Sequence, residues 1–144
     1  MAGDSTVQGF LDAYRLAFES FDVPAIVDQF SYPCQITSDA GEITVTVVPT
    51  REAWVPLIER LIAAYRAIGV RTAQATGLRS IELSSGLAVA GVRWSLLDSE
   101  GQPLYDFDAA YTLADRGDGL RIVAIAHNEA PKLNEALGRL RAGA

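Results

Sequence analysis

Residues 87–114 read LAVAGVRWSLLDSEGQPLYDFDAAYTLA, and this stretch decides the fold. Apolar and polar residues alternate on both sides of Ser99-Glu100-Gly101, which is the pattern of two half-buried strands joined by a turn. Further strand patterns precede and follow this pair, and turn signals at this spacing favour sequential antiparallel pairing. The second half of the chain is therefore predicted to form four strands, over 70–84, 87–97, 103–114 and 120–128.

The chain before residue 70 is predicted to be mainly helical. Over residues 4–21 apolar side chains recur at intervals of three and four, which is typical of a helix with one buried face. Asp22 is placed to cap a short second helix. Thr50 is placed to cap a third helix that ends at Gly69, a residue suited to a left-handed C-cap. Pro56 within that helix predicts either a bend or a later start.

Between the second and third helices the spacing changes to alternation. Strand patterns beginning at Cys34 and covering 43–48 flank a turn at Asp39-Ala40-Gly41, which indicates a hairpin. A short terminal helix is expected over 131–141 because leucines recur on one side of it. Helices are thus segregated from strands, and we expect one α+β domain spanning residues 1–144.

Composition excludes several classes of function. The net charge of the 144 residues is −6 and the basic residues are scattered, which argues against a nucleic-acid partner. There is no apolar run of membrane-spanning length and no export signal, so we expect no membrane association and a cytoplasmic location. Cys34 is the only cysteine. Neither a metal-ligand cluster nor a glycine-rich phosphate loop is present, and we expect no metal and no cofactor.

Several phrases resemble the nuclear-transport-factor-2-like (NTF2-like) cone superfamily. They are Phe10-Leu11-Asp12-Ala13-Tyr14 leading into residues 21–30, Thr50-Arg51-Glu52-Ala53 at the third helix, and Tyr111-Thr112-Leu113 followed by residues 118–122. The resemblance covers almost the whole chain. It implies N-terminal helices packed on a strongly curved, mixed but mostly antiparallel sheet that forms a cone with an internal pocket. Because the superfamily includes ketosteroid isomerases, polyketide cyclases, dehydratases and non-enzymatic modules, it does not fix a reaction.

The resemblance also suggests positions for chemistry. Tyr14 falls near the first-helix tyrosine that donates to the substrate carbonyl in ketosteroid isomerases, and Asp39 or Ser38 falls near their aspartate base. At the place of their second, proton-holding aspartate this sequence has Tyr111, with Asp108 three residues earlier.

Alternation within one strand separates charge from aromatic rings. Asp106 and Asp108 are predicted on one face, and Tyr105 and Phe107 on the other. The carboxylates either face solvent, or a bulge turns Asp108 into the cavity, where desolvation would raise its pKa.

The end of the last predicted strand carries further polar groups. His127 is the only histidine, and imidazole has an ordinary pKa of about 6.5, which makes it the best proton shuttle in the sequence. If the strand continues, Glu129 lies on the same side and a pairing with His127 is conceivable. Otherwise Asn128 and Glu129 are polar groups at the rim.

Three functional hypotheses follow. The first is a binding module with an apolar, aromatic pocket for a small hydrophobic molecule, which forms a homodimer through the exposed face of its sheet. The second is a cofactor-independent isomerase, cyclase or dehydratase acting on a carbonyl-containing hydrophobic substrate. The third is a structural domain with a filled core. The candidate lining residues are Phe10, Trp54, Tyr65, Trp94, Phe107 and Tyr111, and the candidate catalytic residues are Tyr14, Asp39, Asp108 and His127.

Overall fold

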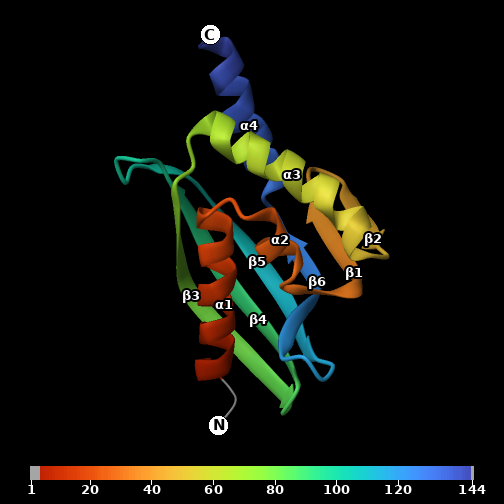
Figure 1. Ribbon diagram of the computed structural model, residues 1–144. Coiled ribbons are helices and arrows are strands. Elements are labelled where there is room, and N and C mark those ends of the chain that lie inside the picture. Colours follow the sequence, from red (N-terminus) through yellow and green to blue (C-terminus); the bar gives the residue numbers. More distant parts are fainter. Residues whose placement is uncertain (1–3, 144) are drawn as a thin grey trace.

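The computed structural model describes residues 4–143, in which three helices lie against one six-stranded sheet and a fourth extends beyond it (Figure 1). The helices are α1 (Asp4–Glu19), α2 (Val23–Val27), α3 (Arg51–Ile68) and α4 (Ala130–Ala142). The strands are β1 (Phe30–Asp39), β2 (Ile43–Val48), β3 (Thr72–Ser84), β4 (Leu87–Leu97), β5 (Pro103–Asp115) and β6 (Leu120–His127). The predicted α+β class is confirmed.

The sheet has the order β2-β1-β6-β5-β4-β3. Neighbouring strands are antiparallel except β1 and β6, which are parallel, so the sheet is mixed as the resemblance implies. In the register of β4 and β5, Trp94 lies opposite Phe107 and Ala90 lies opposite Tyr111. Paired residues share a face of the sheet. The rings of Trp94, Phe107 and Tyr111 therefore project together toward the helices.

The predicted caps of the helices are present. Asp22 accepts a hydrogen bond from the Ala25 amide at the start of α2, and Thr50 accepts one from the Ala53 amide at the start of α3. Gly69 ends α3 with φ of 88°. Because of the Thr50 cap, α3 starts at Arg51, and the expectation of a later start is wrong.

Two further details differ from the sequence prediction. Helix α3 continues through Pro56, whose missing hydrogen bond falls on the exposed side of the helix, where water can reach the backbone. Strand β1 begins at Phe30 and not at Cys34, because Phe30 pairs with Ile122 of β6 before an irregularity that ends at Gln35. A pairing between segments so distant in sequence leaves no local pattern.

The core lies between the helices and the facing side of the sheet. Its most deeply buried large side chains are Leu11, Ile26, Val27, Val48, Leu113 and Ile122. No helix in the described part of the chain is both long enough and apolar enough to cross a membrane.

Candidate functional site

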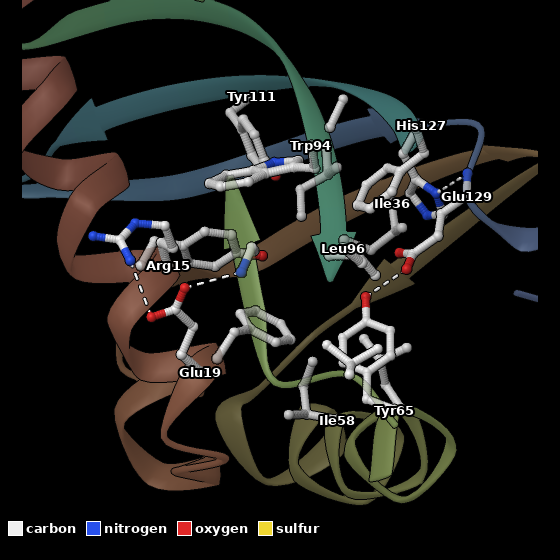
Figure 2. A pocket seen from close by; sticks show the side chains of 18 of the residues that line it. Arg15, Glu19, Ile36, Ile58, Tyr65, Trp94, Leu96, Tyr111, His127 and Glu129 are labelled. Atoms are coloured by element: carbon white, nitrogen blue, oxygen red, sulfur yellow. Dashed lines mark hydrogen bonds and ion pairs between the residues drawn. The ribbon is translucent and has the colours of Figure 1, made fainter. Parts of the chain in front are cut away.

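A cavity of about 120 Å³ lies between α1, α3 and the inner face of the sheet. Its aromatic lining consists of Tyr14, Phe18, Trp54, Tyr65, Trp94, Phe107 and Tyr111. Aliphatic side chains, among them Ile36, Ile58 and Leu96, complete the apolar wall (Figure 2). An apolar space with a small number of polar groups is the usual form of a small-molecule site.

Glu129 is the most deeply buried acid at the cavity wall, with 8% of its surface exposed. Its Oε2 atom accepts hydrogen bonds from the Tyr65 hydroxyl at 2.5 Å and from the Tyr105 hydroxyl at 2.8 Å. Burial raises the pKa of Glu129, and the two phenol donors partly oppose that rise because they stabilise the ionised form. The result is a carboxyl group whose pKa lies above its ordinary value.

His127 lies beside Glu129 at the same end of the cavity (Figure 2). Its Nδ1 atom accepts a hydrogen bond from the Glu129 amide at 3.1 Å. An accepting Nδ1 atom places the proton of the neutral ring on Nε2. Burial lowers the pKa of His127, which favours this neutral form.

Tyr111 and Tyr14 form a second polar group deep in the cavity. The Trp94 indole donates to the Tyr111 hydroxyl oxygen at 2.8 Å, and the Tyr14 and Tyr111 rings meet edge to face at 5.6 Å. Burial raises the pKa of both phenols. Both hydroxyls therefore stay protonated at neutral pH and are able to donate hydrogen bonds.

Trp54 contributes a polar atom with no partner. Its Nε1 atom is buried and makes no hydrogen bond within the described residues, while its ring makes an edge-to-face contact with Phe30. A buried donor without an acceptor costs about 1–3 kcal/mol. An acceptor on a bound molecule would remove that cost.

An ion pair marks another side of the cavity (Figure 2). Arg15 and Glu19, one turn apart on α1, are 3.0 Å apart between Nη1 and Oε1. The other Glu19 oxygen accepts a hydrogen bond from the Ala73 amide of β3 at 2.9 Å. Glu19 thus joins α1 to the edge strand of the sheet.

The structure brings most of the sequence-predicted residues together. Tyr14 and His127 line the cavity, as do Trp54, Tyr65, Trp94, Phe107 and Tyr111. Phe10 lies behind this wall, with its ring stacked on that of Tyr14 at 6.2 Å.

Asp39 and Asp108 do not reach the cavity. Asp39 accepts a hydrogen bond from the Gly41 amide in its own turn. Asp108 is exposed and pairs with Arg93 at 3.0 Å, which lowers the pKa of Asp108. The bulge that would turn Asp108 inward is absent, because β5 keeps a continuous register with β4 around it. Both carboxylates border a shallow hollow on the outer face of the sheet.

Sequence reasoning left two positions open for Glu129: on the same side as His127 if the strand continued, or at the rim of the pocket. Alternation did align it with His127, but β6 ends at His127 and Glu129 occupies the N-cap position of α4. Neither the polar role of Tyr105 nor the Arg15–Glu19 pair was predicted. The orientation of Tyr105 was predictable from its spacing of two residues from Phe107, which places both rings on the inner side of the sheet.

Comparison with known proteins shows the family. The model of a family described as NTF2-like protein (DUF6841) matches residues 4–130, whereas no curated protein matches the chain.

Solved structures share the fold at low identity. An NTF2-like protein with a cystatin-like fold from Novosphingobium aromaticivorans is 14% identical, covers 86% of this chain and 79% of its own, and has a TM-score of 0.68. For an NTF2-like protein of unknown function from Shewanella oneidensis the values are 12%, 86%, 97% and 0.67. For one from Pseudomonas putida they are 12%, 87%, 84% and 0.68. The family model spans most of the chain and these structures share its architecture, so the chain belongs to the family of NTF2-like proteins.

Proposed function

We propose that this chain is a small-molecule-binding domain whose ligand lies in the aromatic cavity, with a polar group against Glu129. One observation carries the proposal: a buried carboxyl group borders a mostly apolar space of about 120 Å³. A dry protein cavity of about 150 Å³ holds benzene. The ligand is therefore a molecule about the size of one ring, and a four-ring steroid exceeds the space.

The test of binding uses two neighbouring alanines of β5. Ala109 lines the cavity, whereas Ala110 is exposed on the outer face of the sheet. Leucine at position 109 fills the space that a ring would occupy. Calorimetry with benzyl alcohol, phenol and cyclohexanone is expected to show binding to the natural protein, loss of at least about tenfold in affinity for Ala109→Leu, and no such loss for Ala110→Leu.

Circular dichroism is needed to show that Ala109→Leu is folded. Full affinity in a folded Ala109→Leu protein would place the ligand elsewhere and overturn the proposal. If that variant does not fold, Leu96→Ala replaces it, and a changed preference for larger rings is then the expected result.

A second candidate is a cofactor-independent isomerase, cyclase or dehydratase acting on a carbonyl-containing hydrophobic substrate. The observation that favours it is the Tyr111 hydroxyl, which accepts from Trp94 and lines the same cavity as Glu129. A carbonyl oxygen would accept a hydrogen bond from Tyr111 while the Glu129 carboxylate removes a proton from the adjacent carbon. In an isomerisation, the protonated carboxyl group then returns that proton to the γ-carbon as the double bond moves into conjugation. Proton transfer by a positioned side chain contributes about 10²–10⁴-fold in rate.

Cyclohex-3-enone is a single ring and therefore fits the size of the cavity. Its conversion to the conjugated enone can be followed by ultraviolet absorbance. Turnover is expected in the natural protein and in Asp108→Asn, with a loss of at least about a hundredfold in Glu129→Gln. Equal rates in all three proteins would reject Glu129 as the proton carrier. Absence of turnover in the natural protein would reject this reaction and leave the binding proposal standing.

We also propose that two copies associate through the outer face of the sheet. Across four strands of that face, the residues in one row are Gly91, Ala110, Ala126 and Thr37, all small. Large apolar side chains stand at the two edge strands: Val45 is 59% exposed and Ile81 is 65% exposed. A row of small residues between exposed apolar side chains at both edges gives the outer face of the sheet a shape and composition that suit contact with a second protein surface.

A further inference from the structure

Glu129 has no positively charged partner among residues 4–143. The ion pairs among the described residues join Arg15 to Glu19, Arg51 to Asp28, Arg93 to Asp108 and Arg139 to Glu135. Lys132 is the nearest cation along the chain, but its Nζ atom donates to the Asp106 carbonyl at 2.6 Å. Buried carboxylates are ordinarily paired, and Glu129 is an exception.

Burial disfavours the ionised form of Glu129, but several neighbouring groups stabilise a negative charge on it. The hydroxyls of Tyr65 and Tyr105 both donate to its Oε2 atom. Glu129 also stands at the N-cap of α4, a helix of 13 residues whose N-terminal end carries a partial positive charge. His127 adds no counter-charge, since its Nδ1 atom accepts a hydrogen bond and its ring is neutral. A cation beside the carboxyl group would oppose the effect of burial and favour the ionised form of Glu129.

One oxygen of the carboxyl group remains available. Both phenols donate to Oε2, and Oε1 makes no hydrogen bond to another residue in the described part of the chain. Glu129 lines the same cavity as the aromatic rings of Tyr65, Phe107 and Tyr111. The face of an aromatic ring attracts a cation within about 6 Å of its centre. A positive group in the cavity would therefore meet a carboxylate oxygen and aromatic rings together.

We propose that the ligand of this cavity is a small organic ammonium ion, in which a protonated amine on a single-ring apolar body donates to Oε1 of Glu129. The inference rests on the proposed binding function and names the chemical class of the ligand. The amine supplies the charge that the protein withholds, and the apolar body fills the rest of the aromatic space. A neutral alcohol of the same shape would make the hydrogen bond but leave the carboxylate without a counter-charge.

Benzylamine and benzyl alcohol test the inference, because they share one shape and differ in charge at neutral pH. We expect benzylamine to bind the natural protein at least about tenfold more tightly in calorimetry. In Glu129→Gln this preference is expected to disappear, because glutamine can accept a hydrogen bond from either ligand but carries no charge to pair with the amine. The glutamine oxygen still accepts from both phenols, so the variant retains the local hydrogen bonds.

Asp108→Asn provides the matched control, since it removes one negative charge from the outer face of the sheet, outside the cavity. The preference for the amine should survive in this variant. If it disappears there as well, the effect comes from overall charge and the inference is overturned.

The remaining outcomes separate the inference from the binding function. Equal binding of the two ligands to the natural protein would overturn the ammonium inference and leave a cavity for neutral molecules. Failure of both ligands, and of phenol and cyclohexanone, would overturn the binding function and the inference together. Unfolded Glu129→Gln would be replaced by Glu129→Ala, for which the same loss of preference is expected.

Discussion

At the scale of single residues, Glu129 and His127 respond to burial in opposite directions. Burial raises the pKa of the glutamate and lowers the pKa of the histidine, because in each case the neutral form is favoured. The two groups also have different partners: phenol hydroxyls for Glu129 and a backbone amide for His127. Because the pKa shifts of the two groups have opposite directions, their contributions to stability depend on pH with opposite sign.

The expected linkage for Glu129 is a loss of stability as pH rises. Its pKa in the unfolded chain is about 4.5 and its pKa in the folded protein is higher, so the folded state binds more protons between these two values. Its contribution is fully present below the unfolded value and is lost as pH rises through the folded value. Glu129→Gln is expected to remove this part of the pH dependence.

Urea unfolding of both proteins at several pH values from about 4 to 8 measures the effect. The difference between them isolates Glu129, because the contribution of His127 is common to both. The contribution of His127 has the opposite pH dependence: it is present above the unfolded pKa of about 6.5 and is lost as pH falls through the lowered pKa of the folded protein. A difference that stays constant with pH would contradict the assignment of a raised pKa to Glu129.

At the scale of elements, two glycines in helical regions predict opposite effects of one substitution. Gly69 caps α3 with φ of 88°, a conformation that costs an alanine about 1 kcal/mol. Gly9 lies within α1, and an added methyl group there meets no atom within 4 Å. Gly69→Ala is expected to lower the free energy of unfolding by about 1 kcal/mol and Gly9→Ala to raise it by about 0.5–1 kcal/mol.

Urea denaturation of the two variants provides the measurement. Gly69 also has open space around an added methyl group, so its penalty comes from backbone conformation and not from a clash. Changes of equal sign in the two variants would show that these assignments of backbone geometry are wrong.

The elements themselves were largely predictable because their signals are local. Alternation in β5 placed Phe107 on the face opposite Asp108, and the structure agrees because Phe107 lines the cavity and Asp108 is exposed. The caps at Thr50 and Gly69 marked both ends of α3. The parallel pairing of β1 with β6 joins distant segments and has no local signature. It came instead from the resemblance, which implied a mixed sheet.

The candidate site was less predictable than the fold for a similar reason. Tyr14 and His127 were identified, but Asp39 and Asp108 lie on the outer face, where unbroken alternation in β5 holds Asp108. Glu129 was underestimated because the chain turns from β6 into α4 at this point, and alternation stops where the strand stops. Its two tyrosine donors come from positions 24 and 64 residues away.

At the scale of the whole molecule, the outer face of the sheet predicts a dimer. Light scattering at micromolar concentration is expected to give twice the chain mass of 15.4 kDa. Ala126→Arg places a charge in the row of small residues on that face and is expected to yield a monomer that still folds, because Ala126 is exposed in the single chain.

Ala63→Arg is the matched control, since Ala63 is exposed on α3, away from the sheet. This variant should keep the double mass. A natural protein with the mass of one chain would contradict the proposed association, and a monomer produced equally by both variants would place the contact elsewhere.

Helix α4 lies outside the cavity wall but adjoins Glu129, the buried acid of the site. No residue of α4 lines the cavity, yet the helix begins directly after Glu129, and its Lys132 fastens it to β5. The family model ends at residue 130, where this helix begins. A chain shortened to that boundary would keep every lining residue and lose the support that aims the carboxyl group. On the proposed binding function, substitutions in α4 would therefore shift the Glu129 carboxyl group without changing any residue of the cavity wall.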